Sequence, residues 1–415
     1  MCEPARGADL MERVAPEAAG LSTAGLDAVD AAVQAAVDAG KIAGAITLVA
    51  RHGRIARIST MGVDDLATGK PIAEDTIFRI FSMTKPITAT AMMILHDQGL
   101  WHPDDPVAKH LPEFVDVRVL AGEAADGTPL LEAPARAPTM LDLLTHRAGF
   151  GYGTNFGPPS DRIEAMYREA KVLDAADLND MVARLAPLPL AHQPGTTWRY
   201  SLSMDVQGAI IERLTGQSLP DFYRERIFVP LGMIDTDFFV PPAKRDRLAT
   251  LYYGSGDAPL AAIANPLRPD PDAPPAFAMG GGGLYSTVVD YARYAQMLLN
   301  GGELDGVRIV SAAGVREQMT NRLPEEMLET PWTAGQQKFR PGFGYGYNGV
   351  VFYDPALAGL PVGRGTYHWD GAAGTWFWVD PEHDLIFVGL IQLLSFTAPP
   401  LQETTQRLIG ASLID

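Results

Sequence analysis

The sequence predicts an α/β fold of the α+β type, in which one antiparallel sheet is built from both ends of the chain. Two runs rich in β-forming residues, 43–50 and 54–61, are joined by a tight turn near the N-terminus. Near the other end, runs 374–379 and 385–391 flank a polar turn that contains Pro381. Because two antiparallel strands are not stable alone, we expect these pairs to meet in one sheet.

Helical segments are predicted around this sheet. Residues 22–38 place apolar side chains at helical spacing behind a Ser or Thr cap, and residues 401–413 form a closing helix. A further strand is expected at 367–370. From residue 88 to about 214 the pattern is mostly helical and is broken by loops rich in proline and glycine, such as 120–138.

The length of 415 residues favours about two structural lobes. We expect an α/β domain from residues 1–85 and 205–415, flanked by the terminal helices, and an inserted, mainly helical domain from 86–204. Clefts between lobes commonly hold functional sites, so the active site is expected between the two.

Composition narrows the class of partner and compartment. The net charge of −17 argues against nucleic acid and anionic membranes as partners and is compatible with a small-molecule substrate. The single cysteine, Cys2, cannot form an intramolecular disulfide, which fits a reducing compartment. With no apolar leader and no long apolar run, the protein is predicted to be cytoplasmic. Nothing in the sequence indicates an oligomeric state.

One short motif carries chemistry. Ser82 and Lys85 are followed by Pro86 and an apolar run, and proline is tolerated only in the first turn of a helix. A helix that begins near Ser82 puts the two side chains one turn apart on one face, at the positive end of the helix dipole. A partly desolvated lysine there can be neutral near pH 7 and accept the serine proton. The alternative is a serine N-cap followed by a surface lysine.

Two later segments offer further groups. Tyr200 follows a proline–glycine turn and precedes a predicted helix at 204–214. A phenol near a lysine ammonium has a lowered pKa and can act as acid and base, although a packed aromatic residue is the simpler interpretation. In 368–374, small residues would let a substrate lie along a strand edge with a backbone N–H directed at an oxyanion, and a plain bend is the alternative.

Other motifs exclude functions. The glycine run 280–283 lacks a following Gly-Lys-Ser/Thr, so a tight turn or a close backbone approach is expected rather than a phosphate site. No histidine spacing matches a metal site, and neither a metal nor a cofactor is expected. The absence of Gly-x-Ser-x-Gly argues against the α/β-hydrolase route to ester hydrolysis.

Taken in order, segments 78–85, 141–150, 194–202, 281–286 and 369–371 resemble the serine β-lactamase-like hydrolases. This superfamily contains the class C β-lactamases and DD-peptidases, and the chain is most similar to its family VIII carboxylesterases. The resemblance runs from about residue 17 to the end of the chain and implies a β-lactamase/transpeptidase-like fold.

By this resemblance Ser82 is the acylated nucleophile, Lys85 its base and Tyr200 the proton shuttle. The oxyanion hole would be the backbone N–H groups of Ser82 and Ala372. The expected substrate-binding residues are Trp369, Asp370, Gly371, Phe150, Tyr152 and Ser201. Aromatic residues that could wall an acyl pocket, about half of which we expect in the core, are Phe150, Tyr152, Phe343, Tyr345, Tyr347, Trp369 and Trp376.

The chain departs from its penicillin-processing relatives at two places. Leu202 replaces the asparagine of their Tyr-x-Asn motif, and 369–371 read Trp-Asp-Gly where they carry Lys-Thr-Gly. Trp369 stands where those relatives carry a lysine that would hold a substrate carboxylate, and Asp370 would repel such a carboxylate. Carboxylated β-lactams should therefore bind poorly. No role is assigned to Asp370 itself.

The predicted function is therefore a serine carboxylesterase for short-chain acyl esters that uses no cofactor. A β-lactamase or DD-peptidase is the disfavoured alternative, and weak β-lactamase turnover as a side activity stays open. An acyltransferase that uses an alcohol in place of water shares every catalytic residue and stays open. A non-catalytic ligand-binding relative is opposed by the intact set of Ser82, Lys85 and Tyr200.

Overall fold

The architecture was analysed in a computed structural model of the chain. It describes residues 11–414 apart from 155–157, 257, 267–269, 329–331, 335–336 and 340, and no side chain between 329 and 340 is described. Cys2 and the rest of the N-terminal segment lie outside the described residues. No helix in the described part of the chain combines the length and the apolar character needed to cross a membrane.

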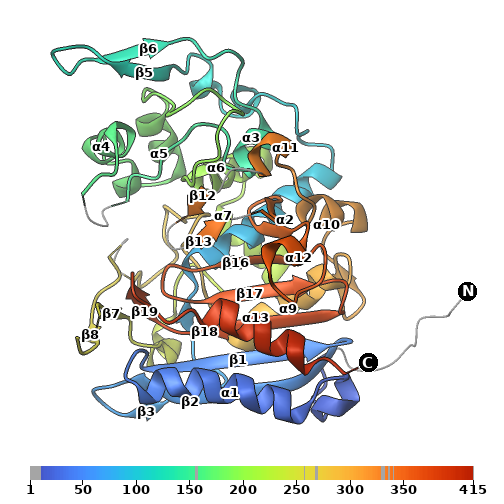
Figure 1. The fold of residues 1–415 in the computed structure, drawn as a ribbon. Coiled ribbons are helices and arrows are strands. Elements are labelled where there is room, and N and C mark those ends of the chain that lie inside the picture. The colour runs from blue at the N-terminus through green and yellow to red at the C-terminus, as the bar shows by residue number, and fades with distance from the viewer. Residues whose placement is uncertain are drawn as a thin grey trace, which may run out of the picture.

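An eight-stranded antiparallel sheet has the order β14-β15-β16-β17-β18-β1-β2-β3 (Figure 1). Its central pairing joins the two ends of the chain, since β1 lies between β2 and β18, with Ile46 opposite Leu390. The predicted sheet is thereby confirmed. The strands are β1 (Gly44–Arg51), β2 (Arg54–Asp65), β3 (Lys70–Pro71), β14 (Phe343–Tyr345), β15 (Val350–Phe352), β16 (Tyr367–Asp370), β17 (Trp376–Asp380) and β18 (Leu385–Leu390).

Both faces of the sheet are covered by helices. Alternate residues of β1 point to opposite faces, so Val49 packs in the cluster that contains α1 (Thr23–Asp38) and α13 (Leu401–Ser412), while Leu48 packs in the larger cluster on the other side. The two terminal helices lie together, as the hydrogen bond from Ser22 N–H to the Ser412 carbonyl (2.8 Å) shows. The larger cluster includes α9 (Val288–Leu299).

A mainly helical region lies above the sheet in Figure 1. Its helices are α2 (Thr84–Asp97), α3 (Met140–Leu144), α4 (Arg162–Glu169), α5 (Leu178–Leu185) and α6 (Ser203–Thr215). One core cluster contains Leu48 of the sheet, Met92 of α2 and Val182 of α5, so sheet and helices share apolar packing. The domain boundaries proposed from the sequence stay a prediction.

One segment of this region differs from the prediction. Residues 120–138 were expected to be a loop, but β5 (Val119–Glu123) and β6 (Pro129–Glu132) pair there as an antiparallel ribbon. Its tip carries Asp126-Gly127, a turn signal that marks a hairpin as well as a loop. Most side chains of this ribbon are exposed, so it lacks the alternation of a half-buried strand.

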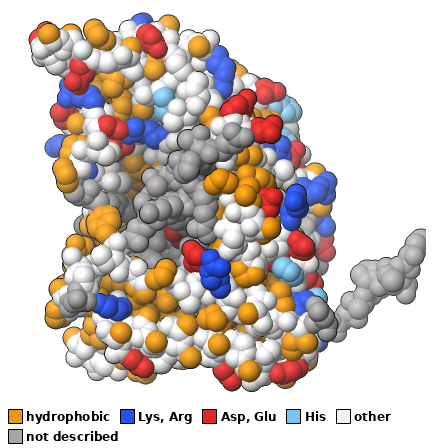
Figure 2. Space-filling model, in the orientation of Figure 1, with side chains coloured by type: hydrophobic (Ala, Val, Ile, Leu, Met, Phe, Trp, Pro, Cys, Tyr) orange, Lys and Arg blue, Asp and Glu red, His pale blue; other side chains and the backbone are white. Residues whose placement is uncertain are grey.

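The remaining elements are short. The helices are α7 (Leu219–Tyr223), α8 (Val229–Leu231), α10 (Ala312–Gln318), α11 (Glu325–Leu328) and α12 (Pro355–Ala358), with a π-turn at Arg224–Phe228. The strands are β4 (Phe78–Arg79), β7 (Tyr252–Gly254), β8 (Ala261–Ala262), β9 (Tyr285–Ser286), β10 (Glu303–Leu304), β11 (Val307–Arg308), β12 (Trp332–Ala334), β13 (Gln337–Phe339) and β19 (Leu393–Ser395). On the face shown in Figure 2, Lys and Arg side chains are interspersed with Asp and Glu.

Candidate active site

Ser82 lies on a sharp turn between the sheet region and α2. Strand β4 pairs with β9, and Phe81 then takes a φ of 43°, a left-handed conformation that costs a non-glycine residue about 1 kcal/mol. A single 3₁₀ turn, Phe81–Met83, leads into α2, and Pro86 falls in the first turn of that helix. The Phe81 side chain packs against Leu251, Ala373 and Leu394, which holds this turn in place.

The structure brings Ser82, Lys85 and Tyr200 together. Lys85 Nζ lies 3.0 Å from Ser82 Oγ, and the Tyr200 hydroxyl lies 2.7 Å from the same oxygen. The lysine comes from α2 on the same helix face, as predicted, while the tyrosine comes from the segment just before α6. Ser82 Oγ therefore has one partner that can take its proton and a second partner that can donate one.

Lys85 is fully buried and is surrounded mainly by neutral oxygens. Besides Ser82 Oγ, its Nζ donates to the Gly281 carbonyl and lies 3.3 Å from the Tyr152 hydroxyl. Burial lowers the pKa of Lys85 to about 7, and the charges of Asp205 and Asp370 act in the opposite direction. A large share of the molecules thus carries a neutral amine at neutral pH, which is the form that can accept a proton.

Tyr200 differs from the prediction in its ionisation. The sequence suggested that a neighbouring ammonium lowers the pKa of the phenol, but burial raises the pKa of Tyr200 well above its ordinary value. The hydrogen bonds with Ser82 and Trp369 oppose this rise without cancelling it. A Lys85 that is itself often neutral does not supply the field of a permanent cation, so Tyr200 remains a protonated donor.

Tyr152, which was expected to contact substrate, lines the cavity that holds Ser82 and also contacts the lysine. Its hydroxyl reaches Lys85, and its ring stacks on Tyr200 with centroids 5.3 Å apart. The Tyr152 N–H donates to Glu164 Oε1 (2.9 Å), and Arg199 Nη2 donates to the same oxygen (2.9 Å). This carboxylate therefore ties the Tyr152 loop to the segment that carries Tyr200. The glutamate lies 12 and 35 residues from its partners, and no local sequence pattern signals such a contact.

The glycine run packs against the lysine through its backbone. Gly281 N–H donates to Asp205 Oδ1 (3.1 Å), and the Gly281 carbonyl accepts from Lys85. A Cβ on Gly280 would lie 2.6 Å from the Met204 carbonyl oxygen, and one on Gly281 would lie 2.8 Å from Asp205 Oδ2. The expected close backbone approach is confirmed. Asp205, fully buried in the first turn of α6, was not recognised from the sequence.

A cavity of about 1070 Å³ opens beside Ser82. The end of β16 supplies one wall with Trp369 and Asp370, together with Gly371 and Ala372 of the turn that follows, and Tyr152 and Tyr200 supply another. The Ala372 residue is exposed, and Gly371 lies so near the chain before Ser82 that a Cβ there would meet the Ile80 carbonyl at 2.4 Å. Apolar side chains from β15, from the segment after α12 and from residues 393–401 complete the wall, among them Phe352, Leu360, Leu393, Phe396, Ala398 and Leu401.

Two expected substrate contacts are wrong, because Phe150 and Ser201 do not line this cavity. Phe150 is buried and packs edge-to-face on Phe114 at 5.4 Å, inside the helical region. The Ser201 hydroxyl is buried and bonds His146 Nδ1 (2.9 Å) and Ser203 Oγ (2.8 Å). Of the other aromatic residues expected at an acyl pocket, the cavity is lined by Phe343 and Trp376, whereas the core holds Tyr345 and Tyr347.

A family model described as Beta-lactamase matches residues 29–411. The chain belongs to this family. It is 38% identical over 371 residues to protein Rv1367c of Mycobacterium tuberculosis, covering 88% of this chain and 90% of the relative. It is 34% identical over 385 residues to esterase EstB of Burkholderia gladioli, covering 87% and 89%. The solved structure of EstCE1, a hydrolase with promiscuous acyltransferase activity, is 26% identical with a TM-score of 0.75, covering 94% and 98%.

The resemblance to the serine β-lactamase-like superfamily, and with it the fold, is confirmed by these comparisons. Two of the residues that depart from the pattern of penicillin-processing relatives, Leu202 and Asp370, lie in different surroundings in the structure. Leu202 is fully buried in the large core cluster, while Asp370 is partly exposed in the cavity wall. The positions that differ from penicillin-processing relatives and line the cavity are therefore Trp369, where those relatives carry a lysine, and Asp370.

Proposed function

We propose that the protein is a serine carboxylesterase that cleaves short-chain acyl esters through an acyl-enzyme at Ser82. One observation carries the proposal: Ser82 Oγ is hydrogen-bonded to a buried lysine with a pKa of about 7 and to a protonated tyrosine, at the wall of a largely apolar cavity. The 34% identity to esterase EstB supports the choice of esters as substrates.

In the first half of the reaction, neutral Lys85 takes the proton of Ser82 as Oγ attacks the ester carbonyl. The new Oγ–C bond leaves a negative charge on the carbonyl oxygen, which the N–H groups of Ser82 and Ala372 stabilise. When the intermediate collapses, the bond to the alcohol oxygen breaks. Tyr200 donates its proton to that oxygen and is reprotonated by Lys85.

In the second half, water replaces the alcohol. The water loses a proton to the Tyr200–Lys85 pair as its oxygen attacks the acyl carbon, and the bond to Ser82 Oγ breaks. Ser82 regains its proton and the carboxylic acid leaves. Asp370 in the cavity wall repels carboxylated substrates, so β-lactams with a carboxylate are poor substrates in this scheme.

The decisive test is Ser82→Ala assayed with p-nitrophenyl butyrate. Because the nucleophile is removed, we expect kcat/KM to fall by about 10⁴-fold or more. The matched control is Ser160→Ala, which removes another exposed hydroxyl from the same cavity and should retain activity. Full activity of the Ser82 variant would contradict the proposal. Intact mass after brief exposure to esters should show one acyl group on the wild type and none on this variant.

A second candidate is acyl transfer to an alcohol. It is favoured by the likeness to EstCE1, whose promiscuous acyltransferase activity occurs on the same fold, and by a cavity of about 1070 Å³ that has room for an acceptor. The Tyr200–Lys85 pair would deprotonate an alcohol by the step it uses for water. Adding alcohols to the butyrate assay and measuring new esters separates the two activities, because a pure hydrolase yields only butyrate.

A further inference from the structure

Neither the backbone conformation nor the packing of the folded chain requires a glycine at position 282. Glycine is required where φ is positive or where another group comes too close for a side chain. Every other glycine that the structure describes has a positive φ or a neighbouring atom within 3.0 Å of the place where its Cβ would be. Gly282 has neither: its φ is not in the left-handed region, and the nearest atom to its Cβ position is the Phe81 carbonyl carbon at 3.8 Å.

Gly282 differs in this respect from its three neighbours in the glycine run 280–283. Gly280 and Gly281 pack against the backbone and carboxylate at the start of α6, and a Cβ on Gly283 would lie 2.9 Å from the Phe238 ring. These three residues are glycine because the folded chain leaves them no space. The space beside Gly282 is open, so the group that needs it comes from outside the chain.

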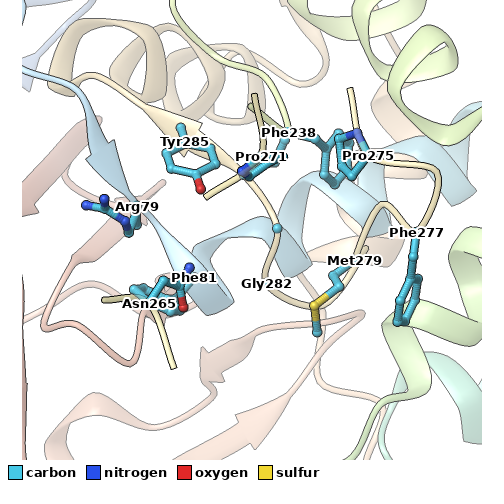
Figure 3. A pocket seen from close by; sticks show the side chains of 12 residues that line it. Arg79, Phe81, Phe238, Asn265, Pro271, Pro275, Phe277, Met279, Gly282 and Tyr285 are labelled. Carbon is cyan, nitrogen blue, oxygen red and sulfur yellow. The ribbon is translucent and has the colours of Figure 1, made fainter. Parts of the chain in front are cut away.

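This open space lies between two cavities. Gly282 and Phe81 line both the cavity beside Ser82 and a second, small chamber of about 30 Å³ (Figure 3). Figure 3 shows Gly282 between Phe81 and the side chains of Met279 and Phe277. The chamber walls are mainly apolar and include Phe238, Phe277, Met279, Pro271 and Pro275.

We propose that Gly282 forms the acyl subsite: the acyl chain of the ester lies over this residue, with its end directed at the small chamber behind Phe81. The inference rests on the proposed esterase function and names its substrate class, esters of short, unbranched carboxylic acids. An alkyl chain gains contact with the apolar walls, and the missing side chain leaves the space that it occupies.

The position of Tyr200 indicates which half of the ester, acyl or alcohol, lies over Gly282. It donates its proton to the departing alcohol and sits 2.7 Å from Ser82 Oγ, so the alcohol is on the tyrosine side of the serine, toward the large cavity. Phe81 and Gly282 belong to the other two segments at the serine, the 3₁₀ turn and the glycine run. The acyl chain is therefore the half of the substrate that reaches them.

The experiment compares Gly282→Ala with wild type using p-nitrophenyl alkylphosphonates that carry methyl or butyl groups. Each labels the nucleophile by forming an Oγ–P bond while p-nitrophenolate leaves, so the labelling rate is read from absorbance and the site from peptide mass. One added methyl group in an apolar pocket changes selectivity by about tenfold or more, so the butyl-to-methyl rate ratio should fall by at least that factor. The same fall is expected in kcat/KM for p-nitrophenyl butyrate relative to acetate.

The controls separate the possible failures. Gly281→Ala, whose Cβ would collide with Asp205, should lower the rates of both phosphonates together, and an unchanged thermal midpoint of Gly282→Ala shows that this variant is folded. An unchanged butyl-to-methyl ratio in Gly282→Ala, with Ser82 still labelled, overturns the acyl subsite and leaves the proposed function standing. A changed preference among benzyl and methyl acetates, with the acyl preference unchanged, overturns it as well. Wild type that is not labelled at Ser82 overturns both proposals.

Discussion

Two buried cations lie six residues apart in this chain, and their surroundings differ. Arg79, on β4, pairs with Asp270 through two hydrogen bonds, one of them 2.9 Å from Nε to Oδ1, and also donates to the Ala249 carbonyl (2.7 Å). Burial raises the pKa of Asp270, yet the pair with Arg79 brings the net pKa below its ordinary value. The Asp270 carboxyl is therefore ionised at neutral pH, beside the Arg79 guanidinium.

Lys85 is buried at least as deeply as Arg79, but its surroundings are different. None of the ion pairs among the residues that the structure describes includes it, and its contacts are the hydroxyls of Ser82 and Tyr152 and the carbonyl of Gly281. Burial lowers the pKa of Lys85 to about 7. In the proposed mechanism, Lys85 can act as a base because no carboxylate of the described residues contacts it and stabilises its charged form, whereas the carboxylate in contact with Arg79 makes a structural tie.

The largest expected effect on activity comes from replacing Lys85 by arginine, the residue type found at position 79. Lys85→Arg places a guanidinium that does not lose its proton beside Ser82, so the serine is no longer activated. We expect kcat/KM for p-nitrophenyl butyrate to fall by about 10³-fold. If the variant kept most of its activity, the assignment of Lys85 as the base would be wrong.

The next largest effect, on stability, is expected when Asp270, the counter-ion of Arg79, is removed. Asp270→Ala leaves Arg79 buried without its carboxylate and should lower the free energy of unfolding by about 3 kcal/mol, measured by urea denaturation. The matched control is Asp272→Ala, because Asp272 is 89% exposed and pairs with Arg245 at the surface. This control should cost less than about 1 kcal/mol. Equal losses in the two variants would contradict the contrast between buried and exposed pairs.

The smallest effect concerns the charge that stands near Lys85 without touching it. Asp205 raises the pKa of Lys85 against the effect of burial. Asp205→Asn keeps an oxygen for Gly281 N–H and removes the charge, so the pKa of Lys85 should fall further. Activity depends on neutral lysine and rises with pH through that pKa, so the acid limb of the kcat/KM profile should move to lower pH. A shift to higher pH would contradict this electrostatic assignment.

The sequence predicted those parts of the site that depend on local spacing. Ser82 and Lys85 are one helical turn apart, and Pro86 sets where that helix begins, so their geometry follows from three neighbouring residues. The sheet was predicted because its strands carry dense β-forming patterns at both ends of the chain. The strands β14 and β15, at one end of the sheet, were missed, since three residues each are too few to show a period.

The rest of the site depends on contacts between distant segments. Glu164, Asp205 and Gly281 reach the lysine cluster from three separate elements, and none carries a local signal for it. Ser201 was misplaced because its hydroxyl bonds His146, which lies 55 residues earlier in the chain, and local spacing does not signal that contact. The pKa of Tyr200 was misjudged because sequence does not report how completely a phenol is buried.

The central strand pair has a consequence for synthesis of the protein on the ribosome. Strand β1 is made early, but its partner on one side, β18, is more than three hundred residues away, with Ile46 opposite Leu390. Until residues 385–390 have emerged, one edge of β1 has no native partner and is open to pairing with other chains. Contacts of such long range form slowly. The nascent chain is therefore most prone to aggregation before its last strands are made.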